Sequence, residues 1–190
     1  MHFFHHIKIT PLEEYTFGKP ETSKHFSEII ALQKANLSTA ISPKSLMEEG
    51  FVTVKHTKRL LEEMHSFHPH SVVFFKGVIV GYALSMHTHF AERVDTLIPF
   101  FKKLESFYSS DVSYLVMGQI CIAKPHRKKG LFRALYSHQL QNVTPNMQWV
   151  VTEVDRRNTR SLNAHKAIGF RHLFTYRIAA VVWDVIALYP

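Results

Sequence analysis

The stretch that decides the fold is MGQICIAKPHRKKGLFRAL, residues 117–135. Its first part is rich in β-forming residues and is stopped by Pro125, which predicts a strand over Ser113 to Ala123. Gly130 then opens a predicted helix in which Leu131 and Leu135 share one face. Free backbone N–H groups and the dipole at a helix start favour anions, so the basic loop at residues 126–130 is typical of a phosphate site. The alternative is a solvated patch without a ligand.

On either side of this stretch the sequence alternates between helical and strand-like patterns. The expected elements are a short opening strand marked by Phe3, Ile7 and Ile9, a connection from Pro11 to Pro20, helices around Ser23 to Leu37 and Lys58 to Phe67, strands over Val72 to Phe75 and Val78 to Met86, a helix around Val94 to Phe107, a strand over Trp149 to Val154, a helix over Thr159 to Ile168 and a pair of strands within Phe170 to Leu188. Lys76-Gly77 is expected to be a hairpin turn in which the glycine supplies the positive φ. The order predicts a mixed α/β fold.

The composition is that of one globular domain. The chain has 190 residues, of which 46% are hydrophobic and 20% charged, so it can build a core and intrinsic disorder is excluded as its main state. No repeat, low-complexity tract or linker separates the elements, so we expect a single domain over residues 1–190.

Cysteine use and hydropathy indicate a reducing compartment. The only cysteine is Cys121, which excludes internal disulfides, and the start MHFFHHIKIT lacks the pattern of a signal peptide. The most apolar runs, Ser71 to Met86 and Ile178 to Tyr189, are shorter than the ~20 residues of a spanning helix. We therefore expect a cytoplasmic protein without a membrane partner.

The charge balance favours phosphate-bearing ligands. With 23 Lys+Arg against 15 Asp+Glu, the formal net charge is +8. The net charge alone does not show whether the ligand is a nucleic acid, an anionic membrane surface or a phosphorylated cofactor.

Residues Ser113 to Phe170 resemble the GNAT superfamily of N-acetyltransferases. The family's first motif, Arg/Gln-x-x-Gly-x-Gly/Ala, cradles the pyrophosphate of acetyl-CoA; Arg127 and Gly130 match its first two fixed positions, and Phe132 occupies the third. The resemblance implies an α/β (mixed α+β) fold with a central, mostly antiparallel sheet and helices on both faces. It also implies acetyl-CoA as co-substrate, bound in the cleft after the strand that ends at Ala123.

The second family motif is an asparagine, a tyrosine seven residues later and Gly-Phe four residues after that. Asn158, Gly169 and Phe170 match it, and His165 replaces the tyrosine. In the family, a splayed strand pair leaves backbone groups free for pantetheine, and by alignment these belong to Ile120, Ile122 and Ala123. The resemblance places Ile120, Cys121, Ile122, Ala123, Arg127, Lys128, Lys129, Gly130, Leu131, Phe132, Asn158 and Ser161 at the co-substrate. For Asn158, a helix N-cap is an alternative or additional role.

Glu153 is the candidate general base. Its strand parity with Trp149 and Val151 predicts an apolar surrounding, in which the pKa of a carboxyl group rises. In several GNAT enzymes a glutamate five residues before the motif asparagine takes the proton of the acceptor amine, and Glu153 stands five residues before Asn158. The alternative is a structural salt bridge with one of the many cations.

His165 is the candidate general acid toward the departing thiolate. It shares a predicted helix face with Ser161 and Ile168, and its ordinary pKa near 6.5 suits proton transfer. A core histidine bonded to a backbone carbonyl is the alternative, and Tyr136 is then the substitute acid.

The sequence does not favour a cysteine nucleophile or a histidine metal site. Cys121 has no base partner in the sequence, so a buried strand cysteine is favoured over a nucleophile. His65, His68, His70, His87 and His89 lack a cysteine or carboxylate at accompanying ligand spacing, so no metal is expected.

The sequence thus predicts an acetyl-CoA-dependent N-acetyltransferase that transfers acetyl directly to a primary amine of a small molecule or peptide. A non-catalytic acyl-CoA-binding module is the first alternative. A basic nucleic-acid-binding protein is the second, but no aromatic-basic RNA signature accompanies the basic loop, so no nucleic-acid partner is expected. The acceptor site is expected to involve the N-terminal helices, Met86 to Phe90 and the loop before Ser113. The oligomeric state stays open, a homodimer included.

Overall fold

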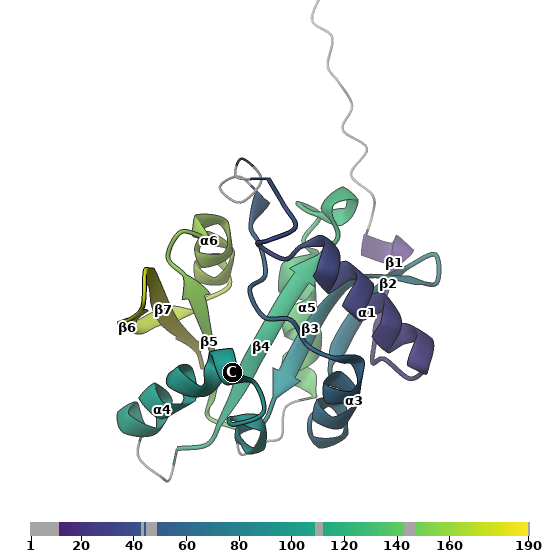
Figure 1. The fold of residues 1–190 in the computed structure, drawn as a ribbon. Coiled ribbons are helices and arrows are strands. Elements are labelled where there is room, and N and C mark those ends of the chain that lie inside the picture. The colour runs from purple at the N-terminus through teal and green to yellow at the C-terminus, as the bar shows by residue number, and fades with distance from the viewer. Residues whose placement is uncertain (1–11, 43, 45–48, 109–111, 143–146, 190) are drawn as a thin grey trace, which may run out of the picture.

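The computed structural model describes residues 12–42, 44, 49–108, 112–142 and 147–189 (Figure 1). The elements are, in chain order, η1 (Leu12–Glu14), β1 (Tyr15–Gly18), α1 (Ser23–Ala35), α3 (Lys58–Phe67), β2 (Ser71–Phe75), β3 (Val78–Met86), η2 (Thr88–Phe90), η3 (Asp95–Leu97), α4 (Ile98–Phe107), β4 (Tyr114–Ile122), η4 (Lys124–His126), α5 (Leu131–Gln141), β5 (Trp149–Asp155), α6 (Thr159–Ala167), β6 (Arg171–Ile178) and β7 (Val181–Leu188). In this part of the chain seven strands form one sheet in the order β1-β2-β3-β4-β5-β7-β6. Only β4 and β5 pair in parallel, so the expected mostly antiparallel sheet is confirmed.

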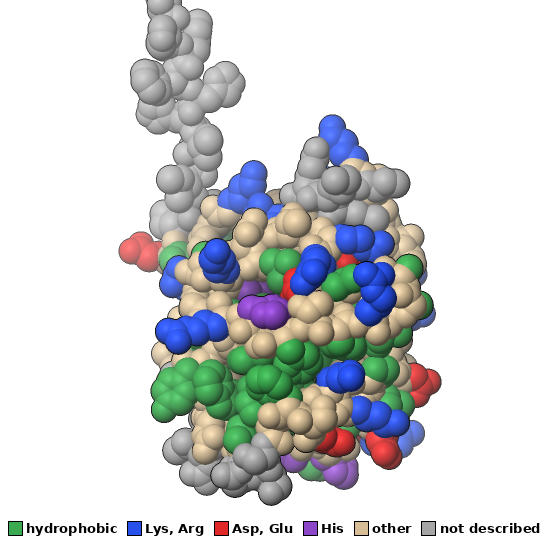
Figure 2. All heavy atoms as spheres, turned by 90° about the vertical axis from the view of Figure 1, so that its left-hand side faces the viewer, with side chains coloured by type: hydrophobic (Ala, Val, Ile, Leu, Met, Phe, Trp, Pro, Cys, Tyr) green, Lys and Arg blue, Asp and Glu red, His purple; other side chains and the backbone are tan. Residues whose placement is uncertain are grey.

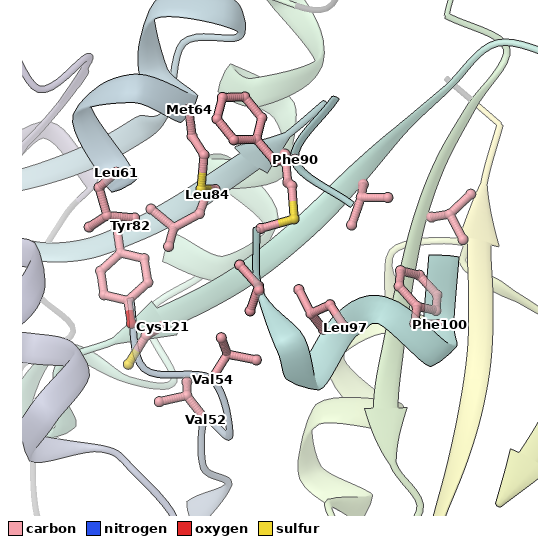
Figure 3. Packing of buried hydrophobic residues seen from close by; sticks show 14 of the residues in the cluster. Val52, Val54, Leu61, Met64, Tyr82, Leu84, Phe90, Leu97, Phe100 and Cys121 are labelled. Carbon is pink, nitrogen blue, oxygen red and sulfur yellow. The ribbon is translucent and has the colours of Figure 1, made fainter. Parts of the chain in front are cut away.

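Helices cover both faces of the sheet, and each face has its own apolar core (Figure 1). On the face of α1, α3 and α4, Leu61 and Met64 pack with Tyr82 and Leu84 of β3, and Phe100 of α4 extends the same cluster (Figure 3). On the opposite face, α5 buries Leu131, Leu135 and Tyr136 against the sheet. The apolar stripes seen in the sequence are therefore the sheet-facing sides of these helices.

Local sequence signals explain where several elements begin. The hydroxyls of Thr22 and Thr57 accept hydrogen bonds from backbone N–H groups in the first turns of α1 and α3, as N-caps do. Lys76 and Gly77 have φ values of 50° and 77°, so the expected turn between β2 and β3 is confirmed, with positive φ at both positions.

Some element boundaries differ from the sequence-based expectation. The expected helix from Ser23 ends at Ala35, and Leu37 instead bridges to Val52. The expected helix around Val94 to Phe107 is a 3-10 turn followed by α4, and the helix from Thr159 ends at Ala167. These differences arise at helix ends, where fraying and tertiary contacts outweigh the periodic pattern.

The N-terminal part of the sheet was not foreseen. The opening strand expected at Phe3, Ile7 and Ile9 lies outside the described residues. Within the stretch expected to be a connection, Tyr15–Gly18 forms the edge strand β1, paired with β2. A strand of four residues carries little periodic signal, and its pairing partner lies far along the chain. Among the described residues, no helix has the length and apolarity needed to cross a membrane.

Candidate active site

The sheet opens between its two central parallel strands. β4 and β5 pair only as far as Val116 and Val151, and the Thr152 hydroxyl donates to the Met117 carbonyl at 2.9 Å just beyond. Past this point the two strands no longer pair with each other, although β4 stays paired with β3 to Ile122 and β5 with β7 to Asp155. Their divergence leaves backbone groups that no neighbouring strand satisfies, and two pockets open there.

The larger pocket lies between the end of β4, the basic loop, the start of α5 and α6. Its lining residues are Asn36, Glu49, Gly50, Phe51, Val52, Ile120, Cys121, Ile122, His126, Arg127, Lys128, Gly130, Leu131, Phe132, Asn158, Arg160, Ser161 and Ala164. The structure thus brings together all the predicted co-substrate residues except Ala123 and Lys129.

Among the described residues, the backbone groups at this pocket that lack a strand partner belong to Ile120 and Ile122. The Ala123 N–H donates to the Val80 carbonyl of β3 at 2.8 Å, so the expectation that Ala123 is free was wrong. Since backbone groups of successive strand residues point to opposite sides, those of Ile120 and Ile122 face away from β3, toward the opening. The Ile122 carbonyl accepts from Arg127 Nε at 2.9 Å, which leaves the Ile122 N–H and both groups of Ile120.

The Arg127 side chain connects neighbouring segments of the protein, whereas the sequence led us to expect that it binds the pyrophosphate of acetyl-CoA. Besides Ile122, its guanidinium donates to Asn36 Oδ1 at 2.6 Å, and to the carbonyl and carboxylate of Glu49 at 3.1 and 3.3 Å. The side chain is only 16% exposed. These contacts tie the basic loop to the end of α1 and to the 49–52 segment, so the guanidinium has little capacity left for a ligand.

Other cations lie at the pocket with their charges available. Lys128 and Arg160 line it, and neither side chain makes a hydrogen bond or an ion pair in the part of the chain that the structure describes. The charge of Arg160 helps to lower the pKa of Glu49 on the same wall. Gly130, at φ 80°, precedes the first turn of α5, whose N–H groups are open at the helix start. Lys129 instead lies against the Tyr15 ring and donates to its hydroxyl at 3.3 Å. The larger pocket is therefore suited to an anionic ligand.

Lysine and arginine side chains are numerous on this side of the molecule. Figure 2 shows many of them spread over the upper half of this face, above a band of hydrophobic side chains, with others below at the lower right. Part of the excess of Lys and Arg that gives the net charge of +8 therefore lies on the face that carries α6.

The smaller pocket adjoins the larger one and contains Glu153. Phe51, Val52, Ile120, Asn158 and Ser161 line both pockets. The remaining lining residues are Thr53, Gly118, Gln119, Thr152, Glu153, Val154, Asp155, His165 and Trp183. Met86 to Phe90, expected near the acceptor, line neither pocket.

Burial sets the acidity of Glu153. Loss of solvent raises the pKa of this carboxyl group to about 7, against the opposing effect of a hydrogen bond from the Tyr176 hydroxyl to Oε2. No ion pair to Glu153 forms among the described residues, so the salt-bridge alternative does not hold there. A carboxyl group with this pKa exchanges a proton readily near neutral pH.

His165 and Tyr136 form a buried pair between α6 and α5. The imidazole accepts a hydrogen bond at Nε2 from the Tyr136 hydroxyl at 2.8 Å, and its Nδ1–H donates to the Ser161 carbonyl at 2.8 Å. Burial lowers the pKa of His165 to about 4 and raises that of Tyr136.

This geometry does not fit either residue as the general acid. A neutral His165 has its one N–H proton committed to a backbone carbonyl, as in the alternative of a core histidine. Tyr136 lines neither pocket, and its hydroxyl proton is donated to His165. The Phe132 ring, 5.0 Å from the His165 ring, packs on the same cluster.

Asn158 is a cap that also links two segments. Its Oδ1 accepts from the Ser161 N–H at 3.2 Å at the start of α6, and its Nδ2 donates to the Phe51 carbonyl at 2.9 Å. The N-cap role is confirmed. The side chain also holds the 49–52 segment against α6, where both pockets meet.

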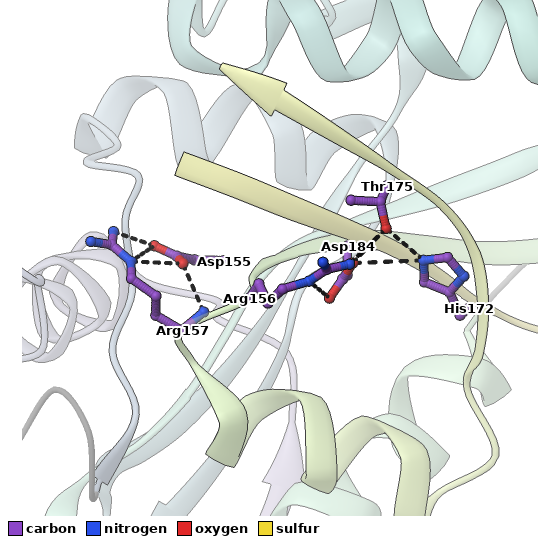
Figure 4. A network of polar contacts seen from close by, with 6 residues as sticks. All are labelled: Asp155, Arg156, Arg157, His172, Thr175 and Asp184. Atoms are coloured by element: carbon purple, nitrogen blue, oxygen red, sulfur yellow. Dashed lines mark hydrogen bonds and ion pairs between the residues drawn. The ribbon is translucent and has the colours of Figure 1, made fainter. Parts of the chain in front are cut away.

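Ion pairs fix the strand ends beside Glu153. Asp155 binds Arg157 at 2.6 Å, and Asp184 binds Arg156, with Thr175 and His172 completing the second group (Figure 4). These contacts join the ends of β5, β6 and β7, so the strand that carries Glu153 is held at its open end.

The surroundings of Cys121 do not favour thiol chemistry. Burial raises the pKa of the Cys121 thiol to about 12, which keeps it protonated and unreactive. In the described ranges, no group of three His, Cys, Asp or Glu side chains is arranged to hold a metal ion.

One wall of the site has no motif in the sequence. Asn36 and residues 49–52 reach the larger pocket by tertiary packing alone. His126 and Arg160 could have been included, because each stands beside a residue already singled out by its motif.

Known proteins resemble this chain in fold but do not match it in sequence. No protein-family model matches the chain, and no curated protein matches it in sequence. Solved structures do match in fold. The ribosomal-protein-S18-alanine N-acetyltransferase from Escherichia coli has a TM-score of 0.61 at 11% identity, over 92% of this chain and 93% of that one.

Two further structures of similar fold are complexes with ligands. Arabidopsis thaliana Naa50, in complex with the bisubstrate analogue CoA-Ac-MVNAL, has a TM-score of 0.61 at 13% identity, over 92% of this chain and 98% of that one. A chain of the NatC complex bound to Gag peptide and CoA has a TM-score of 0.66 at 12% identity, over 93% and 99%. By its sheet order, its split central strands and these likenesses, the chain has the fold of the GNAT N-acetyltransferases.

Proposed function

We propose that the protein is an acetyl-CoA-dependent N-acetyltransferase that acts on a primary amine. The observation that carries the proposal is the position of Glu153, a half-buried carboxyl group in a pocket that opens from the end of the anion-suited cleft. The similar structures with CoA, a CoA-peptide bisubstrate analogue or a peptide support a peptide or amine acceptor.

Acetyl-CoA would lie in the larger pocket. Lys128, Arg160 and the first N–H groups of α5 would face its phosphates, and the free groups of Ile120 and Ile122 would bond the pantetheine arm. The N–H groups turned into the opening would also stabilise the oxyanion that forms on the thioester carbonyl. The acceptor would enter from the Glu153 pocket.

The reaction is a direct transfer between the two pockets. Glu153 takes the proton from the ammonium group, and the neutral nitrogen attacks the thioester carbonyl carbon. The new C–N bond forms and the C–S bond breaks. The nitrogen loses its second proton as it becomes the amide, and the coenzyme A thiolate takes up that proton through water to become the thiol. Because an ordinary thiol has a pKa near 8.5, this group leaves without a strong acid, so the buried state of His165 and Tyr136 is no obstacle.

An acceptor panel tests the proposal. Purified protein is incubated with acetyl-CoA and, one at a time, peptides with free N-termini and small primary amines, while free thiol and the mass of each acceptor are measured. We expect thiol release that depends on the acceptor, with an acetyl group added to its nitrogen. Thiol release without acetylated product, or acetyl-CoA binding without turnover on any acceptor, would contradict the proposal, the latter in favour of a binding module.

A further inference from the structure

Tyr176 of β6 faces Glu153 across the intervening strand β7. Tyr176 and Asp155 are both register partners of Trp183, and Glu153 stands two residues before Asp155, so Tyr176 and Glu153 point to the same face of the sheet. The Tyr176 hydroxyl donates to Glu153 Oε2. Tyr176 is only 9% exposed and its ring lies beside that of Phe174, so packing limits its movement.

Other ionisable groups facing Glu153 are already committed elsewhere. On α6, His165 is neutral and bonded to the Ser161 carbonyl, and on β5, Asp155 is bonded to Arg157 at 2.6 Å. The 51–53 segment and β4 contribute no ionisable side chain to the pocket. In the part of the chain that the structure describes, Tyr176 is the one side chain that donates a hydrogen bond to Glu153.

We propose that Tyr176 is a positioning residue for Glu153: its hydroxyl fixes Oε2, stabilises the ionised carboxylate and leaves Oε1 to take the proton of the acceptor amine. This inference rests on the proposed function and assigns a further residue to the same site. Burial raises the pKa of Glu153 and the hydrogen bond from Tyr176 lowers it, which together give the value of about 7. Burial and the neighbouring carboxylate raise the pKa of Tyr176, so the phenol stays a donor.

The test measures the titration of Glu153 directly, without acetyl-CoA. The carboxyl carbon of Glu153 is followed by ¹³C NMR through the neutral range, with the resonance assigned by its loss in Glu153→Gln. Tyr176→Phe keeps the ring and removes the donor, so we expect the midpoint to rise by about one pH unit, which is a tenfold change in proton affinity. Tyr108→Phe is the matched control, because the buried Tyr108 hydroxyl has no partner among the described residues. Its midpoint should equal that of the wild type.

An unchanged midpoint in Tyr176→Phe would overturn the proposal. If this variant does not fold, 3-fluorotyrosine at position 176 provides a more acidic donor, and the Glu153 midpoint must then fall; a midpoint equal to that of the wild type again overturns it.

In turnover, the acidic limb of the kcat/KM profile of Tyr176→Phe should move up with the midpoint, whereas an equal loss at every pH would indicate a merely structural role. A shifted midpoint in a protein that acetylates no acceptor would contradict the proposed function and leave the assignment of Tyr176 to Glu153 intact.

Discussion

At the scale of single residues, Glu153 links stability to pH. Its pKa of about 7 in the folded protein lies above the ordinary value of 4.5, so the folded state keeps a proton that the unfolded state has released within this window. Stability therefore falls as the pH rises from 4.5 to about 7. The pKa difference corresponds to at most about 3 kcal/mol, less where solvent screens the carboxylate.

Glu153→Gln should remove this dependence. The neutral amide needs no proton to be buried, so the variant should be more stable than the wild type at pH values above the folded pKa, by up to about 3 kcal/mol. The difference should vanish below pH 4.5. Urea unfolding followed by tryptophan fluorescence at both ends of the range measures it. A stability difference that does not change with pH would show that Glu153 has an ordinary pKa.

The Tyr136–His165 pair belongs to the same scale, and its substitutions should act on stability. Tyr136→Phe leaves His165 Nε2 without its donor, and His165→Phe leaves the Tyr136 hydroxyl buried and unpaired, so each should cost about 1–3 kcal/mol. Turnover by Tyr136→Phe should stay close to that of the wild type. Unfolding and kcat are measured on the same preparations. A loss of kcat of about 10² or more with unchanged stability would restore Tyr136 as the general acid.

At the scale of elements, the basic loop and the start of α6 supply the charge for the co-substrate. Lys128→Glu and Arg160→Glu should each weaken acetyl-CoA binding roughly tenfold and reduce the rise in Tm that acetyl-CoA produces. Lys166→Glu makes the same change of charge on the exposed side of α6 and should keep the full rise. Thermal unfolding with and without acetyl-CoA compares the three. Equal shifts in all of them would place the co-substrate elsewhere.

Local signals account for the elements that were predicted well. The helix Lys58–Phe67 and the strand Val78–Met86 have the expected bounds, because a threonine cap and the Lys76-Gly77 turn mark their starts in the sequence itself. The strand β1 was missed because only its pairing with β2 makes it a strand. It matters for the site, since Tyr15 of β1 bonds His126 at 3.0 Å and Lys129, and so anchors the basic loop.

At the scale of the whole molecule, the site lies between two parts of the chain. The residues of one part could be predicted from the sequence, and those of the other could not. The motif side, from Ile120 to Phe132 and from Asn158 to Ser161, was predictable because its spacing is local. The facing wall of Asn36 and residues 49–52 was not, because long-range bonds from Arg127 and Asn158 bring it there. Arg127 was expected to bind the phosphates, but its hydrogen bonds to Asn36 and Glu49 hold the basic loop against this wall. The spacing of residues in the sequence does not indicate these contacts.

The measurement that tests the account most directly compares Glu153→Gln with the wild type on an acceptor that the wild type acetylates. Because Glu153 lines only the smaller pocket, the variant should bind acetyl-CoA with unchanged affinity, while kcat falls by roughly 10²- to 10⁴-fold. The loss should shrink at high pH, where more of the acceptor amine is already neutral. Full activity in the folded variant would contradict the central claim, which is that Glu153, beside the split between β4 and β5, is the base of the acetyl transfer.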